Sequence, residues 1–188
     1  RPRGAGEAAV SDTAMRFAFA DPPYLGMGRL YADRHPEAMI WDDVETHRAL
    51  IERLVRDYPD GWALCLHEPS LRALLPLVPA EARVAAWVKP FAAFKRNVTR
   101  AWTWEPVIFC GGRPIPREAP TWRDHLSEPI ALRKGLPGAK PWRFCEWVLD
   151  GLNWQRGDTL DDLFPGTGVM GEVVAARSGE PMQEGLFA

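Results

Sequence analysis

Five short segments that read as strands alternate with segments of helical periodicity, and this alternation restricts the fold more than any other feature of the chain. The predicted strands are residues 14–20, 62–67, 83–89, 104–110 and 158–164. The first two have the length and apolar content of strands buried inside a sheet. Strands that alternate with helices along a chain form α/β folds. We therefore predict an α/β fold with a mainly parallel sheet of about five strands.

Four segments carry the apolar spacing of helices. In residues 44–58 the apolar side chains recur every three or four positions, Asp42 or Asp43 is available as a cap, and residues 59–61 (Pro-Asp-Gly) end the pattern. The other three segments are residues 69–76, 142–152 and 169–177. We expect these helices to cover both faces of the sheet.

The net charge of −2 conceals a strongly basic middle part. Residues 83–143 hold 12 Lys and Arg against 4 Asp and Glu, whereas the segments on either side are acidic. Five of the nine tryptophans also lie there, Trp87 and the four that we single out, namely Trp102, Trp104, Trp122 and Trp142. Aromatic side chains among basic ones suit stacking on bases beside phosphate contacts. The alternatives are that the charges solvate a long loop and that the indoles fill the core.

Cysteine content and hydropathy indicate a location. The three cysteines, Cys65, Cys110 and Cys145, are far apart and form no C-x-x-C motif, which fits a reducing compartment. The longest apolar runs are interrupted by charges or prolines, and residues 1–12 do not resemble a signal peptide. We expect a cytoplasmic protein without a membrane span. The four histidines show no metal-ligand spacing, so we expect no metal site, and we interpret His67 as structural.

The first motif with chemical content is Asp21-Pro22-Pro23-Tyr24, directly after the first predicted strand. Proline has no N–H and fixes its φ angle, so the backbone carbonyls here are held in place and free to accept hydrogen bonds. Together with Asp21 they offer two acceptors to one planar NH₂ group, and Tyr24 offers a ring for stacking. The alternative is a turn in which Asp21 acts as a cap and Tyr24 packs in the core.

The second motif is the Gly-rich turn at residues 163–171 (LFPGTGVMG), between the last predicted strand and a helix. Ligands bind at such turns in open α/β sheets. Gly166, Gly168 and Gly171 formally match the G-x-G-x-x-G pattern of dinucleotide sites, but only 17 residues follow Gly171, too few for the expected βαβ unit. A tight turn without a ligand is the other alternative.

Together the two motifs resemble those of the S-adenosylmethionine (SAM)-dependent amino methyltransferases that act on nucleic-acid bases. Residues 21–24 resemble the DPPY catalytic motif of that family, and residues 162–168 resemble its D-x-F-x-G-x-G cofactor motif. Lys140-Pro141 resembles the Lys-Pro of a further motif on the cofactor side. The catalytic motif comes first here, as in the circularly permuted β class of DNA adenine-N6 and cytosine-N4 methyltransferases.

The resemblance covers roughly residues 14–24, 83–110 and 138–176. It implies a class I methyltransferase-like (Rossmann-like) fold, circularly permuted and trimmed, in a single catalytic domain over residues 1–188. A loop-rich insert lies at about 111–139. It also implies methyl transfer from SAM to an exocyclic amine, most simply adenine N6 in DNA.

Roles for individual residues follow from the resemblance. Asp21 and the Pro22 carbonyl would hold the amine, with Pro23 fixing the turn and Tyr24 stacking on a base that has left the duplex. The implied cofactor residues are Asp162, Phe164, Gly166, Thr167, Gly168, Lys140 and Pro141. The residues that we expect to contact nucleic acid are Lys89, Lys95, Arg96, Arg100, Trp102, Trp104 and Glu105.

Two departures from the family keep alternatives open. The insert is short for a target-recognition region, so recognition could be relaxed, could concern RNA or a nucleobase, or could depend on a homodimer or a partner subunit. The acidic residue that binds the cofactor ribose in the family has no clear counterpart, and Glu180 and Glu184 are candidates. The alternatives are therefore an RNA or nucleobase amino methyltransferase and an inactive nucleic-acid-binding partner subunit. A nucleotide-dependent oxidoreductase is the more distant one.

Overall fold

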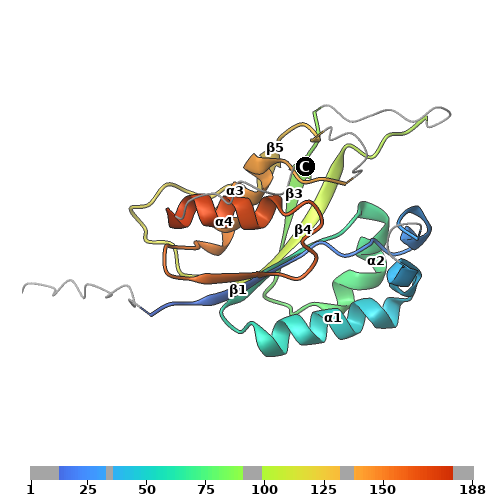
Figure 1. Cartoon of the computed structure of the whole chain (residues 1–188), viewed down its shortest axis with the longest axis horizontal. Helices are drawn as coiled ribbons and strands as arrows, with labels where there is room; N and C mark the ends of the chain where they lie inside the picture. Colours follow the sequence, from blue (N-terminus) through green and yellow to red (C-terminus); the bar gives the residue numbers. More distant parts are fainter. Residues whose placement is uncertain (1–12, 33–35, 91–98, 132–137, 180–188) are drawn as a thin grey trace, which may run out of the picture.

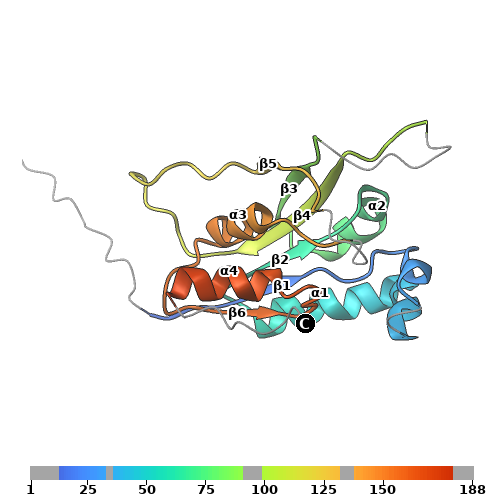
Figure 2. The same ribbon diagram turned by 45° about the horizontal axis from the view of Figure 1, so that its top comes forward.

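The computed structural model describes residues 13–32, 36–90, 99–131 and 138–179. A single mixed sheet runs through this part of the chain (Figures 1 and 2). Its strands are β1 (Arg16–Ala20), β2 (Gly61–Cys65), β3 (Arg83–Val88), β4 (Trp104–Gly111), β5 (His125–Ser127) and β6 (Thr159–Asp162). All five predicted strands are confirmed, and β5 is an additional short strand within the predicted insert.

The strand order is β5-β3-β4-β2-β1-β6. Strand β1 pairs in parallel with both β2 and β6, and β3 pairs in parallel with β5. Strand β4 is antiparallel to both of its neighbours, β2 and β3. The described residues between β3 and β4 form no crossover helix of the kind that joins parallel neighbours. The mainly parallel sheet is thus confirmed, with β4 as the strand that runs the other way.

Helices cover both faces of the sheet, as expected. Helix α1 (Val44–Asp57) and the short α2 (Leu71–Leu74) lie on one face, and α3 (Trp142–Leu152) and α4 (Val169–Ser178) lie on the other (Figure 1). The Asp43 side chain caps α1 by accepting from the Glu45 N–H at 3.0 Å. Helix α3 ends at Asn153, which adopts the left-handed conformation at φ 51°.

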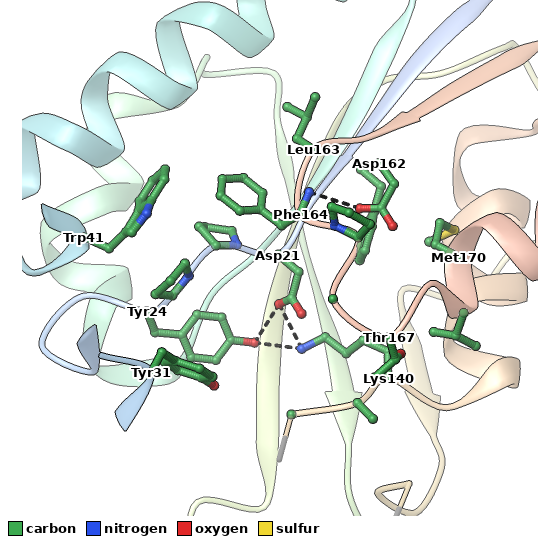
Figure 3. A pocket seen from close by; sticks show the side chains of 18 of the residues that line it. Asp21, Tyr24, Tyr31, Trp41, Lys140, Asp162, Leu163, Phe164, Thr167 and Met170 are labelled. Atoms are coloured by element: carbon green, nitrogen blue, oxygen red, sulfur yellow. Dashed lines mark hydrogen bonds and ion pairs between the residues drawn. The ribbon is translucent and has the colours of Figure 1, made fainter. Parts of the chain in front are cut away.

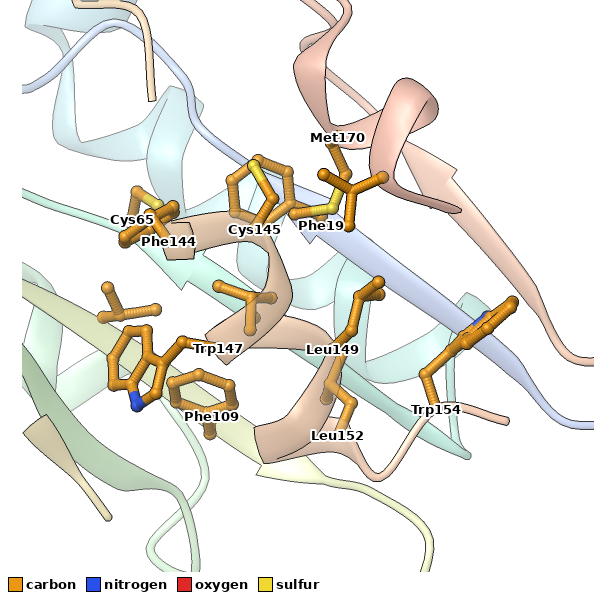
Figure 4. Packing of buried hydrophobic residues seen from close by; sticks show 14 of the residues in the cluster. Phe19, Cys65, Phe109, Phe144, Cys145, Trp147, Leu149, Leu152, Trp154 and Met170 are labelled. Carbon is orange, nitrogen blue, oxygen red and sulfur yellow. The ribbon is translucent and has the colours of Figure 1, made fainter. Parts of the chain in front are cut away.

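Two apolar clusters hold these layers together, one on each side of the sheet. Strand β1 alternates between them, because Phe17 and Phe19 face α3 and α4 whereas Ala18 and Ala20 face α1. Figure 4 shows the cluster under α3, where Phe19, Phe109 and Trp147 lie among buried aliphatic side chains. All three cysteines are free thiols.

Some local structure differs from the sequence prediction. The segment after Tyr24, where no helix was predicted, contains the 3-10 helices η1 (Gly28–Leu30) and η2 (Pro36–Asp42). The helix expected at 69–76 is split into η3 (Glu68–Ser70), α2 and η4 (Leu75–Leu77), with Pro69 and Pro76 at the starts of the two 3-10 turns. Within the described ranges, no helix is long and apolar enough to span a lipid bilayer.

Candidate active site

The two sequence motifs meet at one edge of the sheet. Residues 21–24 directly follow β1, and Asp162 is the last residue of β6. These strands are parallel neighbours in which Phe19 is paired with Asp162, and the Leu163 N–H donates to the Phe19 carbonyl at 2.9 Å. Segments from opposite ends of the chain therefore form one site at the carboxyl ends of the strands, where open α/β sheets bind ligands.

A cavity of about 590 Å³ lies at this edge (Figure 3). A volume of this order suits a small-molecule ligand. Both motifs contribute to its walls, and so do residues from three other parts of the chain, namely the segment 31–41, Glu105 and the segment 138–140. The predicted site residues that line it are Asp21, Pro22, Pro23, Tyr24, Glu105, Lys140, Asp162, Phe164, Gly166 and Thr167.

A cluster of buried charges forms the polar part of the cavity. The Lys140 ammonium lies 2.9 Å from Asp21 Oδ1, 2.9 Å from the Tyr24 hydroxyl oxygen and 3.4 Å from Glu105 Oε2. The Tyr24 hydroxyl donates to Glu105 Oε2 at 2.9 Å, and Lys89 Nζ donates to Glu105 Oε1 at 2.7 Å. Two carboxylates and two ammonium groups thus balance one another in a region that is largely closed to solvent.

The protein environment shifts the pKa values of Asp21 and Glu105 in opposite directions. Burial raises the pKa of Asp21, and the Lys140 charge compensates only part of that effect. Burial also acts on Glu105, but the positive charges of Lys140 and Lys89 outweigh it and lower the pKa of that carboxyl. Burial alone would lower the pKa of Lys140, yet Asp21, Tyr24 and Glu105 together raise it well above its ordinary value. Glu105 is therefore held as an anion, and Asp21 takes up a proton more readily.

One oxygen of Asp21 remains open to a ligand. The contacts of Asp21 with Lys140 and with the Tyr24 hydroxyl both involve Oδ1. Oδ2 has no hydrogen-bond partner among the described residues. In Figure 3 the dashed lines accordingly reach only one of the two carboxylate oxygens. The open oxygen can accept a hydrogen bond from a ligand while Oδ1 keeps the carboxylate in a fixed orientation.

The cofactor-side motif forms a tight turn between β6 and α4. Asp162 Oδ1 accepts from the Phe164 N–H at 3.2 Å, and burial raises the pKa of Asp162 to about 6. Gly166 and Gly168 have φ angles of 50° and 78°, which favour glycine and let the chain turn directly into the helix. Gly168 does not line the cavity but caps α4. Helix α4 begins at the cavity, because its first residue, Val169, is part of the wall.

Several wall residues were not predicted from the sequence. Trp41 packs edge-on against Phe164 with ring centroids 5.1 Å apart, and Tyr31 and Met170 also line the cavity. Tyr31 and Trp41 belong to the segment after the first motif that shows no periodic pattern, so no sequence signal identified them. His67, which we interpreted as structural, stacks on Tyr24 with ring centroids 5.4 Å apart and an interplanar angle of 19°.

Three further predicted site residues, Lys140, Pro141 and Lys89, lie in different surroundings. The Lys140 ammonium points to the Asp21 side of the site rather than to the turn after β6. Pro141 does not line the cavity and precedes the first turn of α3. Lys89, expected at a phosphate, has a side chain only 11% exposed and is paired with Glu105. Little of the Lys89 side chain is therefore accessible to a phosphate.

The remaining residues predicted to contact nucleic acid divide into two groups. Arg100 is exposed and Trp104 is half-buried. Trp102 is 59% exposed, and its indole N–H donates to Glu68 at 3.3 Å. Since Glu68 is adjacent to His67, this hydrogen bond connects the loop before β4 to the segment behind Tyr24. Lys95 and Arg96 lie outside the described residues, as do Glu180 and Glu184.

Comparisons with known proteins identify the fold. No family model matches the sequence, and the search of curated proteins finds no match. Among solved structures, the crystal structure of the M1.HpyAVI–SAM complex is similar, with a TM-score of 0.55 and 15% sequence identity. The match covers 89% of this chain and 80% of that chain. Together with the six-stranded sheet, this likeness shows a class I methyltransferase-like fold.

Proposed function

We propose that this chain transfers a methyl group from SAM to an exocyclic amine of a nucleic-acid base, with adenine N6 in DNA as the first candidate. The observation that carries the proposal is the open Oδ2 of Asp21, in a motif that resembles DPPY and lines the same cavity as Asp162. The order of the two motifs supports the circularly permuted β class. The similar solved structure is a complex with SAM, which supports the same cofactor here.

The residues on the β6 side of the cavity fit such a cofactor. Asp162 supplies a carboxylate for an amino group, and Phe164 and Met170 supply apolar surface. Gly166 has no side chain, so a ligand can approach its backbone closely. The space beside it is open, because a Cβ added there would have the Phe164 carbonyl oxygen, at 3.7 Å, as its nearest neighbour. When bound, SAM supplies an electrophilic methyl group on a sulfonium centre.

Asp21 and its neighbours would prepare the amine for attack. An amine conjugated to a base ring is a weak nucleophile, and acceptors that hold its hydrogens return electron density to the nitrogen. Asp21 Oδ2 and the Pro22 carbonyl are two such acceptors at the end of β1. One amine hydrogen must leave as a proton after the new N–C bond forms, and the raised pKa of Asp21 favours its uptake there. Most of the acceleration would come from positioning.

The nucleic acid would approach the side of the cavity where Tyr24 lies. A base inside a duplex must rotate out to reach a buried carboxylate, and Tyr24, held in place by His67, offers a ring for stacking. Exposed Arg100 and Trp102 lie in the adjoining part of the chain and suit phosphate and base contacts.

Methylation of DNA by purified protein, with Asp21→Asn as the test variant, examines the proposal directly. We expect the variant to bind SAM as the wild type does and to lose at least about a hundredfold in methylation rate. Asp124→Asn, which changes an exposed carboxylate in the same way, is the matched control. Full activity of Asp21→Asn would refute the catalytic assignment.

The identity of the substrate requires a second readout. Nucleoside analysis of the product distinguishes adenine N6 from cytosine N4, and parallel assays on RNA and single-stranded DNA test the alternative substrates. Nucleic-acid binding without methylation of any of them would favour the inactive partner subunit instead.

A further inference from the structure

Glu105 is a second carboxylate in the candidate site and belongs to neither sequence motif. It lies near the start of β4, and its side chain is 17% exposed. Its Oε1 accepts from Lys89, and its Oε2 accepts from the Tyr24 hydroxyl and lies 3.4 Å from the Lys140 ammonium. Both oxygens of Glu105 therefore have donors within the described part of the protein, whereas of Asp21 only Oδ1 does. The contacts of Glu105 hold Lys89, Lys140 and Tyr24 in place.

We propose that Glu105 is a positioning residue that shares the Lys140 ammonium with Asp21 and thereby keeps Asp21 Oδ2 available to the target amine. The inference rests on the proposed methyl transfer and deepens it. An ammonium has three N–H donors, and those of Lys140 have acceptors at Asp21 Oδ1, Tyr24 and Glu105.

Removal of the Glu105 carboxylate would change where these donors point. Of the two carboxylates that contact Lys140 and Tyr24, only Asp21 would remain. A neutral side chain at position 105 attracts the ammonium less strongly than a carboxylate does, so the ammonium would turn further toward the remaining negative charge of Asp21. An ammonium that reached Oδ2 would occupy the oxygen that the amine needs.

The charge balance leads to the same conclusion. Asp21 and Glu105 balance Lys89 and Lys140 in the wild type, so loss of the Glu105 charge leaves an excess positive charge beside Asp21. This excess favours the ionised form of Asp21, and it thereby weakens Asp21 as a base that takes up the amine proton. It also opposes the positive charge that develops on the amine nitrogen during methyl transfer.

The direction of the resulting pH effect can be derived from the groups around Asp21. Within the described part of the chain, the charged and titratable groups that face Asp21 or Glu105 are Tyr24, Cys65, His67, Lys89, Lys140, Cys145 and Asp162. Among them, Lys140 lowers the pKa of Asp21, whereas Glu105 raises it. Loss of the Glu105 charge should therefore lower the pKa of Asp21, and loss of the Lys140 charge should raise it.

The test compares Glu105→Gln with the wild type in the full chain by two readouts. The first is the pKa of the Asp21 carboxyl, measured by ¹³C NMR without added ligand. The second is the single-turnover methylation rate at saturating SAM, as a function of pH. We expect a lowered Asp21 pKa, a rate reduced about tenfold or more at the optimum, and an acid limb displaced to lower pH.

Three further variants complete the comparison. Lys140→Met should move the Asp21 pKa in the opposite direction. Glu105→Asp retains the charge and should keep the Asp21 pKa close to that of the wild type and recover part of the rate. If Glu105→Gln does not fold, the same two readouts are compared between Glu105→Asp, Lys140→Met and the wild type. Glu45→Gln, on the exposed surface of α1, is the matched control and should leave both readouts unchanged.

The outcomes are distinguishable. An unchanged or raised Asp21 pKa in folded Glu105→Gln overturns the inference, and so does a wild-type rate in that variant. A lowered Asp21 pKa in a protein that methylates no nucleic acid supports the coupling between Glu105 and Asp21 and refutes the proposed function instead.

Discussion

Replacement of Asp162 by asparagine should stabilise the ligand-free protein at neutral pH and weaken cofactor binding. Burial raises the pKa of Asp162 from 3.8 to about 6, so the folded chain carries this negative charge at a cost. Asparagine has nearly the same shape, and its carbonyl can still accept from the Phe164 N–H that Asp162 Oδ1 accepts at 3.2 Å. The substitution therefore removes the charge with little change in packing.

The pKa shift sets the magnitude and the pH range. A shift from 3.8 to about 6 corresponds to about 3 kcal/mol at 1.36 kcal/mol per unit. Asp162 is only half-buried and solvent screens part of its charge, so we expect about 1–2 kcal/mol. A group whose pKa is raised on folding contributes stability that is complete below its unfolded pKa and is lost as the pH rises through its folded pKa. The wild type should lose this contribution between about pH 4 and 6, and the variant should not.

Urea denaturation at several pH values measures the difference. At pH 8 the free energy of unfolding of Asp162→Asn should exceed that of the wild type by about 1–2 kcal/mol, and at pH 3.5 the two should converge. Calorimetric titration with SAM should show the opposite order of the two proteins, with about tenfold or greater loss of affinity in the variant at pH 8. A variant less stable than the wild type at pH 8, or a difference that does not depend on pH, would refute the reasoning.

Three further predictions concern packing and exposure. Gly151→Ala in α3 should destabilise the fold by about 1–3 kcal/mol, because the new Cβ would lie 2.7 Å from Phe109 and 2.8 Å from Trp122. In the same urea experiment Gly171→Ala in α4, which meets no atom within 4 Å, should gain up to about 1 kcal/mol. Trp102→Ala should raise the KM for DNA about tenfold and leave SAM affinity unchanged, because its exposed indole is available for stacking. An unchanged KM would show that Trp102 does not contact the substrate.

The parts of the fold that the sequence predicts are those with strong local signals. The residues at 142–152 have an uninterrupted amphipathic pattern, and α3 has these bounds. Strand β5 was not predicted because the three residues His125, Leu126 and Ser127 form no apolar run. Their extended conformation depends on pairing with β3.

In the candidate site, too, the local motifs could be predicted from the sequence and the long-range contacts could not. The two strand-end motifs could be found because their residue types and spacing are local. The contact of Lys140 with Asp21 joins segments far apart in sequence, and the stacking of His67 on Tyr24 depends on the alignment of β1 with β2. Such contacts become visible only when the strands are assembled, because no local pattern encodes them.

The pairing of β1 with β6 has a consequence for how the candidate site forms during folding. It joins Phe19 to Asp162, so the chain must close a loop of about 140 residues before the two motifs meet. Closure of such a loop costs about 4 kcal/mol in chain entropy, apart from a length-independent constant. A nascent or partly unfolded chain therefore lacks the site altogether. A ligand that contacts both motifs forms a noncovalent link between the two ends of the domain, and its binding free energy is added to the stability of the whole fold.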